Sequence, residues 1–278
     1  SHLSRSLGDR DINTITVDDL RAWRFERFHA DTKYEDHPLR DEVEGELSNA
    51  TKRGVIRALR AFFNWLISEG VLEVSPADRL RLPPKQQHPP KDVSDEDLLA
   101  MLEVARNNPR DYALLMVLAD TGARAAGLAT LTLDRVDLQR QSLMVCEKFG
   151  KCREVYLSDP TAEALRNWLD VHPGDTEKVF SSRRRGQGLS RSGIYQVCKR
   201  LANAANVSGR FNPHAFRHGF ARSLITNGAS LEQVSKLMGH SSVTVTAEAY
   251  AVWTREELRR VHRQCSRVQK LEDENGHV

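Results

Sequence analysis

The stretch His214-Ala215-Phe216-Arg217-His218-Gly219-Phe220-Ala221 decides how the rest of the chain is interpreted, because it places two histidines and an arginine within five residues. Its pattern predicts a helix from His214 to Asn227. On such a helix, His214 and Arg217 stand three residues apart and lie on one face. A single histidine or arginine is more often a capping or surface residue than a catalytic one. The stretch therefore indicates a function only if matching side chains occur elsewhere in the chain.

Matching side chains stand at the ends of other predicted helices and strands. Arg124 follows Thr121-Gly122-Ala123, where a predicted helix ends. Lys148 comes at the end of a predicted strand, and His240 follows a glycine that can close a helix in the left-handed conformation. Tyr250 lies ten residues after His240. The candidate catalytic set is Arg124, Lys148, His214, Arg217, His240 and Tyr250.

These residue types suit the transfer of a phosphoryl group, whose transition state spreads negative charge over the phosphate oxygens. Arg124 and Arg217 can each donate paired hydrogen bonds to nonbridging oxygens, which a lysine cannot reproduce. A tyrosine hydroxyl with an ordinary pKa of about 10 is a poor nucleophile at neutral pH, so surrounding cations and a base such as His214 would favour its ionised form. No cluster of metal ligands accompanies the set in the sequence, and we expect neither a metal nor a cofactor.

Several segments resemble the motifs of the tyrosine recombinase or phage integrase family, which includes the Xer-type dimer resolvases, and they follow one another along the chain in the same order as in that family. Thr121-Gly122-Ala123-Arg124 resembles the first-arginine motif of the family, and the stretch from His214 resembles its HxxRH helix. Leu237-Met238-Gly239-His240-Ser241-Ser242, followed by Tyr250, resembles the third motif. Lys148-Phe149-Gly150-Lys151-Cys152-Arg153 is similar to the family's β-hairpin. One such motif would be weak, but this ordered combination is specific.

The resemblance implies a site-specific DNA recombinase or integrase that cleaves and rejoins DNA through a 3′-phosphotyrosyl intermediate at Tyr250 and exchanges strands via a Holliday junction. In this scheme the hairpin lysine, Lys148, protonates the leaving 5′ hydroxyl. His240 donates a hydrogen bond to a nonbridging oxygen. The covalent phosphotyrosine retains the energy of the broken phosphodiester, so rejoining requires no ATP.

The sequence departs from the family pattern in two places. The family usually has an acidic residue three positions after its first arginine, where this chain has Gly127. We therefore expect the group that orients Arg124 to come from elsewhere in the chain. Tyr250 also lies one residue further from His240 than in many relatives. We prefer Tyr250 as the nucleophile over Tyr195, which lies within a predicted helix ahead of the HxxRH segment.

The run Leu82-Pro83-Pro84-Lys85-Gln86-Gln87-His88-Pro89-Pro90-Lys91 contains four prolines in ten residues and favours an extended connector. We predict a helical core-binding, DNA-clamping domain over 1–82, a linker over 83–92, a catalytic domain over 93–253, and a C-terminal helix and tail for subunit contact over 254–278. The expected fold is mainly α with a small antiparallel β-sheet. Helices are predicted to begin at Thr16 and over 51–69, 94–105, 110–119, 160–169, 190–205, 214–227, 231–238 and 254–268, and strands over 136–138, 142–147 and 153–157.

The predicted partner is double-stranded DNA that carries a specific recombination site. The net charge of +3 permits but does not require binding to a polyanion, so the contacts must come from local basic surfaces. A helix with a basic face opposite its apolar stripe can contact phosphates, although such a face is often merely solvated. The candidate DNA-binding residues are Lys52, Arg53, Arg57 and Arg60 on the helix over 51–69, Arg183, Arg184 and Arg185 in a loop, and Arg191 at a helix start.

We further expect a homotetramer on DNA, assembled through the C-terminal helix, since in relatives the segment after the tyrosine docks into an adjacent subunit. The sequence lacks a run of eighteen apolar residues and a signal pattern, so it predicts no membrane association and a cytoplasmic location. Cys146, Cys152, Cys198 and Cys265 form no CxxC pair and are expected to be reduced thiols.

Two other functions remain open on the sequence alone. A type IB topoisomerase would use the same phosphotyrosine chemistry to relax supercoils as a monomer. A catalytically impaired DNA-binding accessory protein would keep the fold without the activity, and Gly127 keeps this alternative open. The sequence does not specify the target site, because phosphate contacts position a protein without reading bases.

Overall fold

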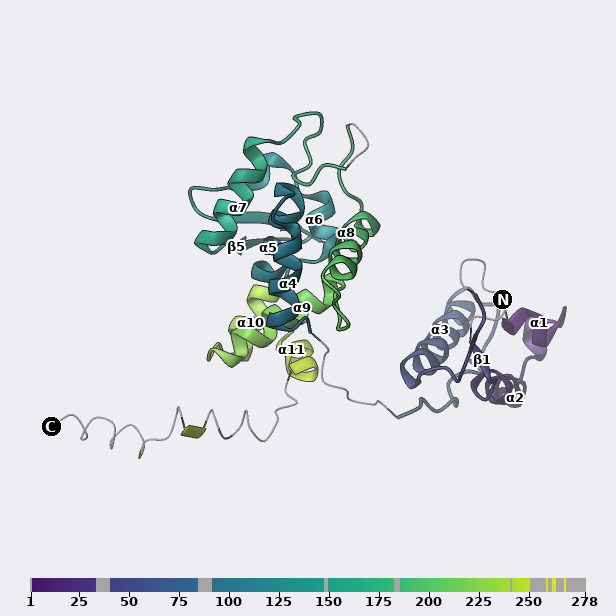
Figure 1. The fold of residues 1–278 in the computed structure, drawn as a ribbon. Coiled ribbons are helices and arrows are strands. Elements are labelled where there is room, and N and C mark those ends of the chain that lie inside the picture. The colour runs from purple at the N-terminus through teal and green to yellow at the C-terminus, as the bar shows by residue number, and fades with distance from the viewer. Residues whose placement is uncertain are drawn as a thin grey trace. The chain divides into compact units, whose positions relative to one another are not determined.

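The computed structural model describes residues 2–33, 41–84, 92–147, 150–182, 186–240 and 242–250, together with residues 259, 262, 263 and 268. Contacts within the chain divide it into two compact units, Ser1–His88 and Pro89–Val278 (Figure 1). Of the predicted linker, residues 85–91 lie outside the described residues, as does most of the predicted C-terminal helix.

The smaller unit is built on two helices, α2 and α3, and each begins with a side-chain cap. Before α2, the Thr16 hydroxyl accepts a hydrogen bond from the Asp19 N–H, and the Asp19 carboxylate accepts one from the Thr16 N–H, which forms the predicted capping box. Ser48 caps α3. The core of the unit is formed by buried side chains of these two helices, Leu20, Trp23, Ile56 and Phe63 among them. The elements are α1 (His2–Leu7), η1 (Ile12–Thr14), α2 (Val17–Phe28), β1 (Thr32–Lys33), β2 (Val43–Glu44) and α3 (Asn49–Ser68).

The larger unit combines helices with a three-stranded antiparallel sheet in the order β3-β4-β5. This arrangement confirms the predicted class, mainly α with a small antiparallel sheet. Its elements are α4 (Asp95–Ala105), α5 (Pro109–Thr121), α6 (Ala125–Thr130), η2 (Leu133–Arg135), β3 (Val136–Asp137), β4 (Ser142–Cys146), β5 (Cys152–Tyr156), α7 (Asp159–Asp170), α8 (Arg191–Ala204), α9 (Pro213–Thr226), α10 (Leu231–Met238) and α11 (Val243–Tyr250).

Helix α5 lies at the centre of the larger unit, where it packs against α7 and α9 (Figure 1). Its leucines Leu114, Leu115 and Leu118 are fully buried, because the helix has neighbours on more than one side. The fully buried Asp111 carboxylate is paired with Arg110 on the same helix and with Arg200 of α8. These two ion pairs hold the N-terminal end of α5 against α8.

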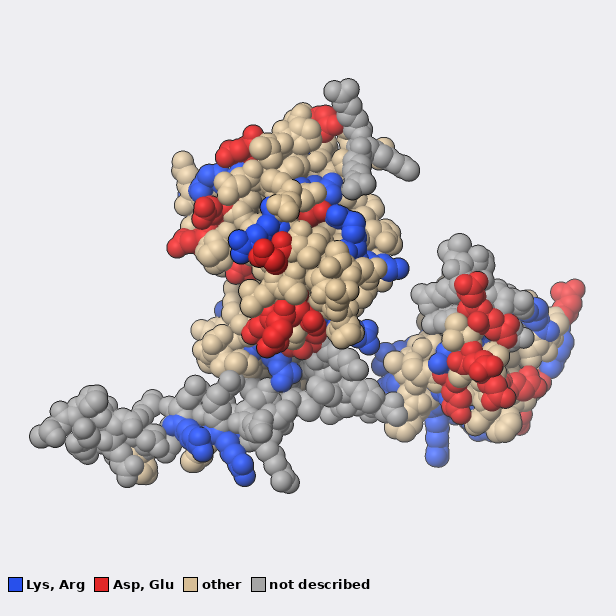
Figure 2. Space-filling model, viewed as in Figure 1, with Lys and Arg blue, Asp and Glu red and all other residues tan. Residues whose placement is uncertain are grey.

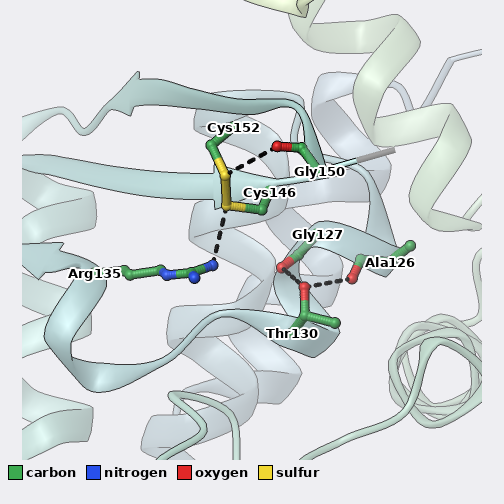
Figure 3. Close-up of a disulfide and its surroundings, with 7 residues drawn as sticks. All are labelled: Ala126, Gly127, Thr130, Arg135, Cys146, Gly150 and Cys152. Atoms are coloured by element: carbon green, nitrogen blue, oxygen red, sulfur yellow. Dashed lines mark hydrogen bonds between the residues drawn. A yellow bond between two sulfur atoms is a disulfide. The ribbon is translucent and has the colours of Figure 1, made fainter. Parts of the chain in front are cut away.

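The prediction that all cysteines are reduced is wrong for one pair. Cys146 and Cys152 form a disulfide between β4 and β5 (Figure 3). The antiparallel register places these two residues directly opposite each other, although six positions separate them in the sequence. Because register depends on the fold, the spacing alone did not indicate the bond. Cys198 is a buried free thiol, and Cys265 lies outside the described residues.

Within the described part of the chain, no helix is both long enough and apolar enough to cross a membrane. The same residues contain no group of three or more metal-ligating side chains placed to hold an ion.

Candidate active site

Arg217 joins three separate segments of the larger unit. Its side chain is only 3% exposed, on α9. Nη1 donates to the Gly122 carbonyl oxygen at 2.7 Å, and Nη2 donates to the Met238 carbonyl oxygen at 2.5 Å. Both acceptors are carbonyls at helix C-termini, whose partial negative charge favours a buried cation. The predicted catalytic arginine therefore also holds the end of α5 and the end of α10 against α9.

The first-arginine motif is positioned by the turn after α5. Gly122 has a φ of +56°, in the left-handed region that glycine adopts without penalty. A Cβ at this position would lie 2.5 Å from Cδ1 of Phe220, so the turn also needs a residue without a side chain. Arg124 follows as the N-cap of α6, with 42% of its side chain exposed. Partial burial lowers the pKa of its guanidinium.

His214 stands in the first turn of α9, beside Arg217 on the same helix. The Asn212 side chain caps this helix by accepting hydrogen bonds from the N–H groups of His214 and Ala215. Burial lowers the pKa of His214, and the charges of Arg217 and Arg124 lower it further. Its ring packs edge-on against His218, with ring centroids 4.4 Å apart. A neutral His214 imidazole at physiological pH can accept a proton.

His240 follows the left-handed Gly239 that closes α10, as predicted. Burial lowers the pKa of His240 to about 4, and the charges of Arg217, Arg124 and Arg153 act in the same direction. Its Nδ1 lies 2.7 Å from the hydroxyl oxygen of the buried Thr246 on α11. When that hydroxyl donates to Nδ1, the neutral ring carries its proton on Nε2 and can donate it to a phosphate oxygen.

Thr246 was not singled out in the sequence, yet it connects two parts of the site. It lies on α11 one turn before Tyr250, the last residue of that helix. Its contact with His240 therefore holds the helix of the predicted nucleophile against the end of α10. Helices α9, α10 and α11 lie together at one end of the larger unit (Figure 1). Lys148 and the side chain of Tyr250 are outside the described part of the structure.

The structure brings four of the predicted catalytic residues together from distant parts of the sequence. Arg217 shares α9 with His214 and donates to the carbonyl oxygens of Gly122 and Met238, which stand two residues before Arg124 and His240. The charges of both arginines lower the pKa of both histidines. His218 belongs to the same group, because burial followed by the charges of His214, Arg217 and His240 lowers its pKa to about 4. The result is a basic site with neutral imidazoles, which is suited to a phosphate ligand.

Three of the four basic residues predicted on α3 have partners within the chain. Lys52 forms an ion pair with Glu46 at 3.1 Å, Arg53 donates to the Pro83 carbonyl oxygen, and Arg60 donates to the Leu80 carbonyl oxygen at 2.7 Å. Arg57 is exposed. The segment that includes residues 80 and 83 therefore lies along the basic face of α3. Helical periodicity does not reveal this packing.

Charge is mixed on the surface of the larger unit. On the face seen in Figure 2, its Lys and Arg side chains lie among Asp and Glu side chains rather than forming one continuous basic surface. Arg191 is exposed at the first position of α8. Arg183, Arg184 and Arg185 lie outside the described residues.

We expect the free energy of unfolding to fall when the pH is lowered from 7 to 5. His218 and His240 have folded pKa values of about 4, compared with an ordinary value of 6.5. Between these values the unfolded chain binds more protons than the folded chain, so acidification favours unfolding. Urea unfolding midpoints at pH 7 and pH 5 measure the effect above the ordinary carboxyl pKa of about 4.

The control is the double variant His218→Gln/His240→Gln, in which the difference between the two midpoints should shrink. An undiminished difference in that variant would assign the pH dependence to other groups.

Comparisons with known proteins identify the family to which the chain belongs. Residues 91–257 match the model of the phage integrase family. The tyrosine recombinase XerC of Alcanivorax borkumensis is 30% identical over 250 residues, which cover 86% of this chain and 76% of the relative. XerD of Mycobacterium leprae is 31% identical over 233 residues, which cover 77% and 73% of the two chains.

Solved structures show the same fold. The crystal structure of XerA recombinase superposes with a TM-score of 0.59 at 25% identity, covering 95% of this chain and 88% of that one. The Tn1549 transposon integrase in complex with transposon right end DNA gives a TM-score of 0.73 at 19% identity, covering 94% and 89%. The chain belongs to the phage integrase family. Within that family, it is a tyrosine recombinase.

Proposed function

We propose that this chain is a site-specific recombinase that cleaves and rejoins double-stranded DNA through a 3′-phosphotyrosyl intermediate at Tyr250 and exchanges strands via a Holliday junction. The observation that carries the proposal is that Arg217, on the same helix as His214, donates to the carbonyl oxygens of Gly122 and Met238, two residues before Arg124 and two residues before His240. Two guanidiniums and two neutral imidazoles supply the donors and the base that phosphoryl transfer to a phenol needs.

Each predicted residue has a distinct role in this scheme. Arg124 and Arg217 neutralise the nonbridging oxygens as charge develops, and His240 donates to one of them from Nε2. His214 accepts the proton of the Tyr250 hydroxyl as the phenolate oxygen attacks phosphorus and the bond to the 5′ oxygen breaks. Lys148, directly after Glu147 in the chain, gives its proton to the leaving 5′ oxygen. Rejoining follows the reverse path with a different strand.

DNA is the proposed substrate because similar solved structures, including the Tn1549 integrase and a lambda integrase dimer at a core site, contain DNA. The exposed Arg57 on α3 and Arg191 on α8 are the described candidates for phosphate contacts. We further propose a homotetramer on DNA, joined through residues 254–278, and removal of that segment should abolish tetramer formation and recombination.

The proposal is tested by trapping the covalent intermediate. A duplex selected from a random library for binding to the chain is nicked at successive positions, so that the short fragment diffuses away after cleavage. The wild-type chain should then form a covalent protein–DNA adduct, which Tyr250→Phe should abolish. Tyr195→Phe is the matched control and should form the adduct at the wild-type rate, because the partly exposed Tyr195 ring on α8 packs against Phe211, which is not one of the proposed catalytic residues.

Each alternative function predicts a different result. An adduct that persists in Tyr250→Phe would place the nucleophile elsewhere, and a wild-type chain that binds DNA without forming an adduct would be an accessory protein. On a supercoiled plasmid with two copies of the selected site, a recombinase yields deletion or inversion. A topoisomerase yields only relaxed plasmid.

A further inference from the structure

Arg124 has a carboxylate partner that its neighbours in the sequence do not provide. The acidic residue expected at position 127 is absent, but the Glu147 side chain forms an ion pair with Arg124. Glu147 directly follows β4, more than twenty residues after Arg124 in the chain. Only 12% of its side chain is exposed, compared with 42% for Arg124. A partly buried ion pair is screened less by salt than a pair at the surface, so the contact can orient the guanidinium.

The Glu147 side chain lies directly beside Gly127 of α6. A Cβ added to Gly127 would lie 3.4 Å from the Cys146 carbonyl oxygen and 3.7 Å from Cγ of Glu147. The Glu147 side chain therefore passes over Gly127, in the space that a longer side chain from α6 would enter. Figure 3 shows Gly127 on α6 next to the Cys146 end of the hairpin. The carboxylate is thus supplied by the hairpin in place of α6.

Arg153 on β5 connects this pair to the turn before His240. Its Nη1 donates to the Leu237 carbonyl oxygen at 2.5 Å, and its Nη2 lies 3.8 Å from Oε1 of Glu147. Only 14% of the side chain is exposed. A Cβ on Gly239 would lie 2.6 Å from Cδ of Arg153, so the arginine packs directly against the backbone that precedes His240.

We propose that Glu147 is a positioning residue for Arg124, in place of the missing acidic residue at position 127, and that Arg153 joins Glu147 to the turn that holds His240. This inference rests on the proposed function of Arg124. The side chains of Glu147 and Arg153 connect the strand ends of the hairpin to Arg124 and to the turn before His240. Lys148, the proposed general acid, is the next residue after Glu147 in the chain. The negative charge of the Glu147 carboxylate lies close to the guanidiniums of Arg124 and Arg153 and offsets the repulsion between them. This attraction keeps the three side chains together in the absence of DNA.

The first test replaces the carboxylate with a neutral group of the same shape. Glu147→Gln should lower the rate of adduct formation on the nicked duplex about 10- to 100-fold, while the affinity for the same duplex stays within about twofold. Glu154→Gln, on the exposed face of the same hairpin, removes an equal charge and should leave the rate unchanged. A Glu147→Gln rate equal to that of the wild type would overturn the inference.

The second test moves the carboxylate to the position where the family has it. In Gly127→Glu/Glu147→Ala, truncation of Glu147 frees the space above α6, and the new carboxylate should raise the rate at least about fivefold above that of Glu147→Ala alone. Glu147→Ala alone should remain slow. A purely structural role for Glu147 would not be rescued by a charge placed on a different element, so failure of the rescue would argue against positioning.

A measurement without DNA separates this inference from the proposed function. Arg124→Gln and Glu147→Gln should each shift the urea unfolding midpoint, and the double variant should shift it by less than the sum, because both changes remove one ion pair. Additive shifts would overturn the pairing even if the wild type forms adducts. A wild type without adducts would overturn the proposed function while non-additive shifts still support the pairing.

Discussion

Arg217→Lys is expected to lower the rate of adduct formation about 1000-fold and to destabilise the larger unit at the same time. The buried guanidinium donates through separate nitrogens to the carbonyl oxygens of Gly122 and Met238. A lysine ammonium is a single point charge and cannot reproduce this fork. One of the two buried carbonyls would lose its partner, which costs about 1–3 kcal/mol of the free energy of unfolding.

The two effects are measured separately. Adduct formation on the nicked duplex gives the rate, and urea unfolding gives the stability at a temperature where both variants are folded. Arg166→Lys, an exposed position on α7, makes the same chemical change and should alter neither quantity. If Arg217→Lys loses stability but retains the wild-type rate, Arg217 is a structural residue and the catalytic assignment is wrong.

Phe63→Ala is expected to destabilise the smaller unit by about 3–5 kcal/mol. Phe63 is fully buried between α3 and the rest of the unit's core, so truncation removes apolar contacts and leaves a cavity. Its neighbour Phe62 has 42% of its surface exposed. Phe62→Ala deletes the same atoms from a position at the edge of the core and should cost less than about 1 kcal/mol.

Hydrogen exchange measured by mass spectrometry resolves the effect in the full chain. Amides of α3 should lose protection in Phe63→Ala by the amount of the destabilisation, whereas amides of α5 in the larger unit serve as an internal reference. Equal losses of protection in the two phenylalanine variants would contradict the assigned core.

Local sequence signals predicted most helices of both units. The boundaries were found because Thr16, Ser94 and Gly239 act through neighbouring residues, by capping or by left-handed turns. The short strands β1 and β2 and the helices α1, α6 and α11 were not predicted. Elements of two to eight residues are short for a hydrophobic period to show, and they form because the rest of the unit holds them.

The basic residues of α3 show where a local pattern was insufficient. Periodicity placed Lys52, Arg53 and Arg60 on the face opposite the apolar stripe, and this favoured contact with DNA. In the folded chain each of the three has an intramolecular partner. Lys52 pairs with Glu46, which precedes the helix, and the two arginines donate to the backbone carbonyls of residues 83 and 80, which follow it. Only the course of the chain before and after α3 determines which of these cations remain available.

The sequence by itself determined the family and the identity of the six candidate catalytic residues, because those residues occur in motifs whose order and spacing carry the chemistry. The tertiary structure decided how Arg124 is held. Glu147 and Thr246 stand in no recognisable motif, the hairpin motif does not indicate the contacts of Arg153, and the Cys146–Cys152 bond follows from strand register. The contacts of Arg124 with Glu147 and of Arg153 with Leu237 join residues far apart in the chain, and the free energy of an ion pair or hydrogen bond depends on distance in space rather than on separation in sequence.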